Sequence, residues 1–340
     1  MNNNQILTSE EKIDFVIPWV DGSDPQWLHE RRFYRMDEKN DAGRYTDWGT
    51  LKYFFRGTEK YAGWVNKIYF VTWGHIPEWM DAKHPKIKII NHKDYIPRQF
   101  LPTFNSNVIE LNYHRISGLS DKFIVFNDDF FLIDKTSPSD FFLKGMPRSQ
   151  AILTPFRVRK GEWFYTPLND VAILNEHFSP WKSIAEHPLK WINLKYGIDV
   201  LRTIFMLPYN NFFGLKASHL PTPYLKETFK TVWKEEGELL NLVCNHRFRE
   251  STDLSHWLMD WWQCASGLFV PRSNGYGKVF HLTINYEKTL SEALEYIAKQ
   301  KGKVICINDG EIDLTQREEA IKKTKIAFEK LFPEKSSFEK

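Results

Sequence analysis

Two adjacent aspartates, Asp128 and Asp129, stand directly after an apolar run in the stretch KFIVFNDDFFLID, residues 122–134. A run such as FIVF is typical of a strand buried on both faces, and ionised carboxylates beside such a core are costly unless they are paired, solvated or bound to a cation. Mg²⁺ and Mn²⁺ take hard oxygen ligands and keep several waters, so one or two carboxylates beside a diphosphate are a sufficient protein contribution. The pattern favours a metal or catalytic site over a solvated strand end.

A second predicted strand end carries the stretch WVDGSDPQW, residues 19–27. Asp-Gly and Asp-Pro pairs favour turns, so a polar turn is one interpretation. The other is a loop at the carboxyl edge of a sheet that contacts a nucleotide, with Asp21 beside Gly22, whose missing side chain allows close approach of the backbone. The stretch alone does not decide between them.

Further candidate residues lie in the stretches ASHLPTPYLK and NHRFRESTD. His219 is a titratable group that can act as a base, and Arg249 offers a forked cation for phosphate oxygens. Isolated histidines and surface arginines are common, so spacing alone favours structural roles. The late stretch VICINDGEIDL contains Asp309, either a structural residue of a turn or part of a second strand end that converges on the same cleft.

The composition is that of a soluble globular protein, with 340 residues, 42% hydrophobic and 26% charged, and a net charge of +3. So small a charge, without long runs of one sign, does not indicate nucleic acid as a partner. The three cysteines form no CxxC pair, so neither a disulfide framework nor a zinc site is indicated and a reducing cytosol is expected. The first residues, MNNNQILTSEEK, lack the features of a secretion signal, and no window approaches the ~20 apolar residues that span a bilayer.

Apolar runs that predict strands recur in the first 130 positions, at residues 13–20, 67–73, 86–90 and 123–126. A segment with helical spacing, Leu51 to Thr58, lies between the first two. Strands that alternate with helices predict an α/β fold with a mostly parallel sheet and flanking helices, in which ligands bind beyond the carboxyl ends of the strands. Asp21 and Asp128 both follow such ends.

The later part of the chain predicts helices. From Tyr224 the pattern predicts one helix, with Pro221 and Pro223 before it as start signals, and the stretch DLSHWLMDWWQCASGLF predicts a second, capped by Asp253. Residues 318–331 predict a last, basic amphipathic helix. The middle, residues 155–215, is irregular.

In their order along the chain, these blocks resemble the four conserved regions of the Stealth family of sugar-phosphate transferases, which includes bacterial capsular polysaccharide phosphotransferases and the animal lysosomal-enzyme GlcNAc-1-phosphotransferase. The counterpart of the first region in this chain is IDFVIPWVDGSDPQW. The stretches that resemble the second region are LKYFFRGTEKYAGWVNKIYFVTWGHIPEWM, HPKIKIINHKDYIP, LPTFNSNVIELNYHRISGLSDKFIVFNDDFFL and SPSDFF. The third region has its counterpart in HLPTPYLKETFKTVWKEEGELLNLVCNHRFRESTDLS, and the fourth in VICINDGEID with LFPEKSSFE.

The resemblance implies that a hexose or HexNAc 1-phosphate moves from a nucleotide diphosphate sugar such as UDP-GlcNAc to a hydroxyl of an acceptor glycan. The product would be a phosphodiester of a capsular or surface polysaccharide, and UMP would be released. The expected partners are a UDP-HexNAc donor and a polysaccharide repeat-unit acceptor, free or lipid-linked. The expected location is the cytoplasm, including the inner face of the plasma membrane.

The resemblance also implies a fold like that of the nucleotide-sugar-binding glycosyltransferase-A enzymes, with an α-rich C-terminal part that completes the active site. The implied parts are an N-terminal tail at residues 1–12, an α/β nucleotide-sugar-binding part at 13–155, an irregular and helical acceptor and catalytic part at 156–285, and a C-terminal part at 286–340.

The family's functional positions imply roles for individual residues. Catalysis is expected from His219, Asp129, Asp128 and Arg249. Donor binding is expected from Asp21, Gly22, Lys52, Arg56 and Asn127. A divalent cation, Mg²⁺ or Mn²⁺, is expected on Asp128, Asp129 and Asp309. The family's usual arginine in ELRYSLRS is here Lys52 in TLKYFFRG, which keeps the charge but loses the bidentate fork.

Phosphoryl transfer depends on alignment and charge neutralisation, which a metal on the aspartates and the guanidinium of Arg249 could provide. A base must take the proton of the acceptor hydroxyl, with His219 the first candidate and Asp129 the second.

Two alternatives stay open. One is a metal-dependent glycosyltransferase that releases UDP. The other is a non-catalytic polysaccharide-binding module built on aromatic platforms such as Trp163, Trp181 and Trp191. Aspartates together with His219 and Arg249 argue against pure binding, because sugar recognition needs neither a metal nor a base.

Overall fold

The computed structural model describes residues 12–34, 47–156, 165–283, 285–310 and 312–340. Trp163 and all but the last residue of the expected N-terminal tail lie outside these ranges.

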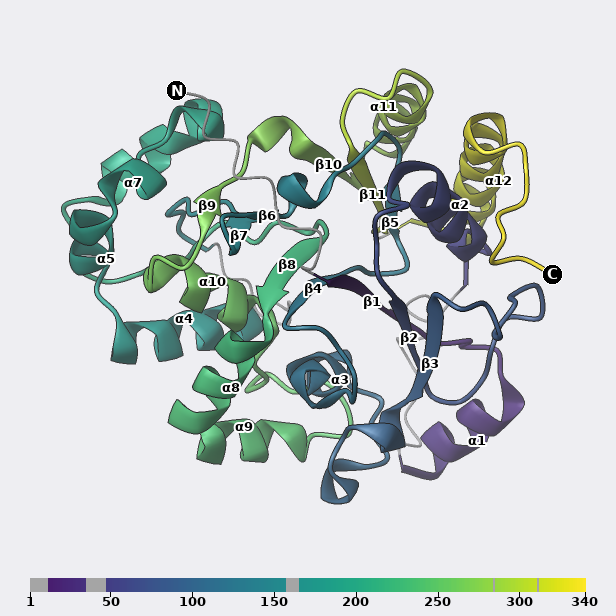
Figure 1. Cartoon of the computed structure of the whole chain (residues 1–340), viewed down its shortest axis with the longest axis horizontal. Coiled ribbons are helices and arrows are strands. Elements are labelled where there is room, and N and C mark those ends of the chain that lie inside the picture. Colours follow the sequence, from purple (N-terminus) through teal and green to yellow (C-terminus); the bar gives the residue numbers. More distant parts are fainter. Residues whose placement is uncertain (1–11, 35–46, 157–164, 284, 311) are drawn as a thin grey trace.

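A five-stranded sheet is the largest sheet of the described chain (Figure 1). Its strands lie in the order β3 (Ile87–Asn91), β2 (Ile68–Thr72), β1 (Ile13–Trp19), β4 (Lys122–Val125) and β8 (Thr222–Leu225). The first four pair in parallel, whereas β8 runs antiparallel to β4. All four predicted strands are confirmed, and with the helices around them so is the α/β class. The apolar runs of β1, β2 and β4 are buried on both faces, as covered parallel strands require, whereas the edge strand β3 is only partly buried.

A second sheet begins where the chain leaves β4. Strand β5 (Phe130–Leu132) follows after a tight turn and pairs antiparallel with β11 (Val304–Asp309), which pairs in parallel with β10 (Gly277–Leu282). A small third sheet joins β6 (Phe142–Leu143), β7 (Met146–Ser149) and β9 (Val270–Pro271). The turn between β4 and β5 therefore lies at the junction of two sheets.

The α-helices of the described chain surround these sheets. They are α1 (Pro25–Tyr34), α2 (Leu51–Tyr61), α3 (Ser106–Leu111), α4 (Tyr165–His177), α5 (Pro180–Glu186), α6 (Pro188–Trp191), α7 (Val200–Met206), α8 (Lys226–Glu235), α9 (Gly237–Cys244), α10 (Trp257–Ala265), α11 (Tyr286–Ala298) and α12 (Leu314–Leu331). The predicted helices at residues 51–58 and 318–331 are confirmed within α2 and α12. None of the described helices combines the length and apolar character that crossing a bilayer requires.

Three apolar cores hold the described elements together. On one face of the main sheet, α2, α11 and α12 share a core with the second sheet, in which Phe15, Phe54 and Phe126 are fully buried. Helix α2 approaches β5 so closely that a Cβ at Gly57 would lie 2.7 Å from the carbonyl oxygen of Leu132. The other face is covered by α3, α8, α9 and α10. The third core lies among α4 to α7 and α10, which thus joins two cores.

The helix predicted from Tyr224 is confirmed as α8, but Pro221 and Pro223 do not mark its start. Residues 222–225 form β8, and α8 begins only at Lys226. The prolines fit because β8 is an edge strand, where a missing N–H does not interrupt the sheet.

The predicted cap of the next helix is also wrong. Helix α10 begins at Trp257, and the fully buried carboxylate of Asp253 instead accepts hydrogen bonds from the side-chain amides of Asn105 and Asn107 at 2.8 and 3.1 Å. A buried carboxylate needs such donors, so Asp253 fixes the loop before α10 onto α3.

The predicted aromatic platforms are not confirmed as a set. Trp191 is fully buried and cannot stack on a sugar. Trp181 is 52% exposed, and its indole N–H donates to the carbonyl oxygen of Leu207 at 2.7 Å. Of the two platforms within the described ranges, one is therefore part of a core.

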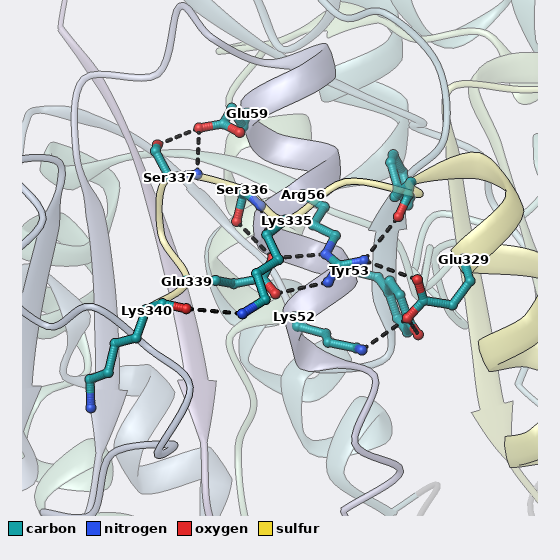
Figure 2. A network of polar contacts seen from close by, with 11 residues as sticks. Lys52, Tyr53, Arg56, Glu59, Glu329, Lys335, Ser336, Ser337, Glu339 and Lys340 are labelled. Carbon is teal, nitrogen blue, oxygen red and sulfur yellow. Dashed lines mark hydrogen bonds and ion pairs between the residues drawn. The ribbon is translucent and has the colours of Figure 1, made fainter.

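The C-terminal segment is fastened to α2 by the two cations that the sequence had predicted to contact the donor (Figure 2). Arg56, only 7% exposed, binds the carboxylate of Glu339 through two N–H donors at 2.7 and 2.9 Å. It also donates to Glu329 and to the carbonyl oxygen of Phe332. The ammonium of Lys52 pairs with Glu329 at 2.9 Å. These contacts support a structural role for both cations and do not support donor binding by them.

The substitution Arg56→Ala should lower the free energy of unfolding by about 3 kcal/mol or more, because it leaves the buried carboxylate of Glu339 without its cation. Lys52→Ala is the matched control, since its half-exposed pair with Glu329 is worth at most about 1 kcal/mol. Urea denaturation measures both values. Equal losses in the two variants would contradict the structural role of Arg56.

Candidate active site

The turn between β4 and β5 carries the two aspartates to the carboxyl end of the main sheet. The backbone N–H of Phe130 donates to the carbonyl oxygen of Asn127 at 3.1 Å, and the phenylalanines on both sides, Phe126 and Phe130, are buried. Asp128 is exposed, whereas the side chain of Asp129 is 22% exposed. Because the turn is anchored in the core at both ends, its carboxylates have a fixed position.

Three segments that are distant in the sequence bring polar atoms to Asp129. Cys306 Sγ and Asn308 Nδ2 donate to Asp129 Oδ2 at 3.3 and 3.2 Å, because β11 pairs with β5 directly beside the turn. His219 Nε2 lies 3.5 Å from the same oxygen. His219 precedes β8, and since β8 runs antiparallel to β4, the residues before it reach the carboxyl end of β4. The structure thus joins Asp129 and His219, as predicted.

Asp129 and His219 stabilise each other's charged forms. Burial acts to raise the pKa of Asp129, but hydrogen bonding and the charge of His219, with the donors Asn308 and Cys306, outweigh it and lower that pKa. Burial acts to lower the pKa of His219, but Asp129, with smaller contributions from other carboxylates, raises it above its usual value. The pair therefore consists of an ionised carboxylate and an imidazole of increased basicity.

Asp128 belongs to an acidic edge. The side chain of Asp128 reaches the surface, but the surrounding protein removes part of its solvation, and this raises its pKa. The charges of Asp129 and Asp47 raise it further. Burial, followed by the charge of Asp21, acts to raise the pKa of Asp47 as well. Asp21 Oδ1 accepts hydrogen bonds from the N–H and hydroxyl of Ser23 at 2.9 and 2.6 Å. Carboxylates that repel one another in this way favour a bound cation.

A second layer behind His219 was missed by the sequence predictions. Glu110 in α3 is 8% exposed, and burial raises its pKa to about 7 although Arg249 and His219 act against this. Its Oε2 lies 3.7 Å from His256 Nε2, and His256 Nδ1 lies 2.7 Å from the hydroxyl of Tyr224. The available signal was one Glu inside the apolar stretch NVIEL. Asp47 and Cys306 were not predicted either.

Other predicted residues lie near this centre without contacting Asp129. Arg249 Nη2 donates to Ser106 Oγ at 2.6 Å at the start of α3, and its charge acts on Glu110. Gly22 and Asn127 lie in the loops after β1 and β4. Because these two strands are parallel neighbours, both loops lie at the same edge of the sheet.

Asp309 has partners of its own. Its Oδ2 lies 2.8 Å from Nε of Arg317, and Trp48 Nε1 donates to the same oxygen at 3.4 Å. It does not belong to the group of possible ligands around Asp129. An arginine therefore neutralises this carboxylate, while its Oδ1 is buried with no hydrogen-bond donor among the described residues, so Asp309 as a metal ligand stays a prediction.

The residues around Asp129 fit a hard cation only in part. Asp129, His219 and Cys306 offer atoms within 4.8 Å of one another, and Asp129 Oδ1 is buried with no hydrogen-bond donor among the described residues. Burial and the charge of Asp129 raise the pKa of the Cys306 thiol, so it stays protonated. A protonated thiol is a poor ligand for Mg²⁺ or Mn²⁺. The carboxylate of Asp129 fits such an ion and Cys306 does not, while Asp128 lies in the same turn but outside this group.

Comparison with known proteins adds an independent observation. Residues 11–39 match Stealth protein conserved region 1, and residues 44–149 match Stealth protein conserved region 2. The chain is 42% identical to a capsular polysaccharide phosphotransferase WcwK of Streptococcus pneumoniae, over 98% of this chain and 100% of the relative. It is 34% identical to the exopolysaccharide phosphotransferase cps2G of Lactiplantibacillus plantarum, over 96% of each chain. It is 36% identical to the receptor polysaccharide phosphotransferase WefC of Streptococcus gordonii, over 97% and 99%.

If the carboxylates hold a hard cation, Asp129→Asn should weaken Mn²⁺ binding by at least about tenfold, since an anionic ligand is lost. Cys306→Ser should leave the affinity unchanged. Titration of Mn²⁺, followed by electron paramagnetic resonance of the free ion with UDP present, measures both. An equal loss in the Cys306→Ser variant would contradict a site made of oxygen ligands.

Proposed function

The chain belongs to the Stealth family, and we propose that it transfers a hexose or HexNAc 1-phosphate from a nucleotide diphosphate sugar such as UDP-GlcNAc to a hydroxyl of an acceptor glycan. The product is a phosphodiester of a capsular or surface polysaccharide, and UMP is released. One observation carries the proposal: the imidazole of His219 is held by the ionised carboxylate of Asp129, next to a second carboxylate. A binding module has no need for such a pair.

The donor binds across the carboxyl ends of β1 and β4, as in glycosyltransferase-A-like enzymes, with Asp21, Gly22 and Asn127 contacting it. The parallel register of the two strands supports this position. Residues 13–155 then form the donor part, residues 156–285 the acceptor part, and residues 286–340 complete the site.

Asp128 and Asp129 hold the divalent cation, Mg²⁺ or Mn²⁺. When bound, it neutralises the charge of the donor diphosphate. The support for this role is the acidic edge and the buried Asp129 Oδ1 without a hydrogen-bond donor among the described residues.

His219 is the base, in preference to Asp129. The carboxylate has a lowered pKa and its Oδ2 accepts two hydrogen bonds besides facing His219, so it is a weak base. Nε2 of His219 faces Oδ2 of Asp129, so the neutral imidazole carries its proton on Nε2. Nδ1 is then free of a proton and takes the one from the acceptor hydroxyl. Asp129 fixes the ring and stabilises the imidazolium, as the carboxylate does in a Ser-His-Asp triad.

The acceptor oxygen attacks the β-phosphorus as it loses its proton to His219. A new phosphorus–oxygen bond forms, the bond from the β-phosphorus to the bridging oxygen breaks, and the bridging oxygen leaves on UMP. Arg249 binds phosphate oxygens during this step. The acceptor is a polysaccharide repeat unit, free or lipid-linked, at the cytoplasmic side of the membrane.

The nucleotide that is released distinguishes this reaction from a glycosyltransferase reaction, in which attack at the anomeric carbon would release UDP. We expect UMP by chromatography and a phosphodiester by phosphorus NMR of the product. His219→Ala should slow UMP release by roughly two to four orders of magnitude, the usual worth of a positioned base, with donor binding nearly unchanged.

The matched control is His29→Ala, which removes an exposed histidine of α1. It should keep full activity. Stoichiometric UDP together with a phosphorus-free product would overturn the proposal.

A second prediction concerns the forked cation. Arg249→Lys keeps the charge but loses bidentate contact, so kcat/KM should fall by at least about tenfold. Arg247→Lys is the control two residues earlier, where the exposed guanidinium stacks 4.6 Å from the ring centre of Tyr34. Steady-state kinetics give kcat/KM for both variants, and only Arg249→Lys should lower it. Unchanged kcat/KM in Arg249→Lys would show that Arg249 does not bind phosphate oxygens.

A further inference from the structure

Exposed apolar side chains are concentrated in one segment of the chain. Seventeen large apolar side chains of the described residues are exposed, and ten of them lie between Trp181 and Phe213. They are Trp181, Leu189, Ile192, Leu194, Ile198, Leu201, Ile204, Phe205, Tyr209 and Phe213. This segment contains α5, α6 and α7, and Figure 1 shows α5 and α7 at one end of the molecule, away from α11 and α12. We call residues 181–213 the apolar end.

The apolar end has an inner and an outer face, and both are apolar. Its inner face is part of the third core, where Trp191 is fully buried and Phe212 is 2% exposed. On the outer face, Leu194 is 95%, Ile198 81% and Phe205 75% exposed. Within α7, the exposed side chains of Leu201, Ile204 and Phe205 follow the i, i+3, i+4 spacing that puts side chains on one face of a helix. So large an exposed apolar surface marks a site of interaction.

Cations border this surface. Lys182 and Lys195 are exposed, and so is the side chain of Arg202 at 58%, although its Nε lies 3.4 Å from Asp199 Oδ1. Of the nearby acids, Asp199 is neutralised within the fold by the ammonium of Lys216 at 3.1 Å, which leaves Glu186 as the exposed anion of the apolar end. The outward charge is therefore positive, and it complements an anionic surface.

We propose that the apolar end docks on an anionic phospholipid bilayer. Its apolar tips enter the boundary of the acyl chains, and its cations meet the headgroups. Fluid lipid can fill the space around each exposed apolar side chain, whereas a folded partner would need a matching pocket for each of them. The lipid surface thus fits both the charge and the shape of the apolar end.

The docking surface is connected to the candidate active site through α10. Trp261 and Ala265 of this helix lie in the core beneath the apolar end. At its first residue, the ring of Trp257 lies 6.3 Å from the ring of His219. Because α10 joins the two places, docking of the apolar end would hold the candidate active site at a fixed distance from the bilayer. Lipid binding needs neither donor nor acceptor, so its test is independent of the proposed reaction.

Flotation of the full chain with vesicles tests this proposal. We expect binding to vesicles of phosphatidylglycerol and phosphatidylcholine and much weaker binding to phosphatidylcholine alone. Leu194→Ser combined with Phe205→Ser should lower the partition coefficient at least about tenfold. Lys182→Glu combined with Lys195→Glu should do the same on the anionic vesicles. The matched control combines Leu242→Ser and Leu314→Ser, which are 65% and 74% exposed elsewhere on the molecule.

Thermal unfolding shows whether each variant is folded, and the control should bind like the unchanged chain. The proposal is overturned if the chain ignores anionic vesicles, or if the folded Leu194→Ser and Phe205→Ser variant binds as well as the control. It is also overturned if light scattering without lipid shows a dimer that this variant abolishes, because the apolar end would then face a second copy of the chain.

Discussion

Strands β4 and β5 follow each other in the chain but belong to two different sheets, so the residues between them must turn at the junction of the sheets. The buried rings of Phe126 and Phe130 hold both sides of this turn. Its polar side chains can therefore lie only at the carboxyl edge of the main sheet. Every contact of Asp129 depends on this position, because β11 reaches it by pairing with β5, and His219 reaches it from the chain that enters β8.

The two aspartates of the turn differ in their chemistry because their partners differ. Asp129 accepts hydrogen bonds from Cys306 and Asn308 and faces His219, so its charge is stabilised despite the surrounding protein. Burial, followed by the charges of Asp129 and Asp47, raises the pKa of Asp128, and these neighbouring carboxylates favour a cation beside it. Asp129 is thus suited to orient the base, and the two carboxylates together are suited to attract a metal ion. This division fits the phosphotransferase names of the relatives that match the chain over nearly its whole length.

Sequence reasoning succeeded where the signal is local. An apolar run with two charges after it predicts a strand and a site without knowledge of any partner; β4 confirms the strand, and the site stays a prediction. It could not find partners that are remote in the sequence. Lys52 and Arg56 were predicted to contact the donor, which stays a prediction, and the carboxylates that bind them lie 277 and 283 residues later in the chain. Strand β8 exists because it pairs with β4, and Glu110 is buried because α3 is covered by later helices; neither fact is visible in the local pattern.

The central claim is that the turn at Asp128 and Asp129 is where the donor diphosphate meets a cation and His219. A crystal structure of the chain with Mn²⁺ and a non-hydrolysable UDP-sugar, solved with the anomalous signal of manganese, tests it most directly. The account predicts one manganese peak at the carboxylates of the turn, bound also by the diphosphate, with the β-phosphorus on the side of His219. A nucleotide bound away from these carboxylates, with no manganese beside them, would contradict it.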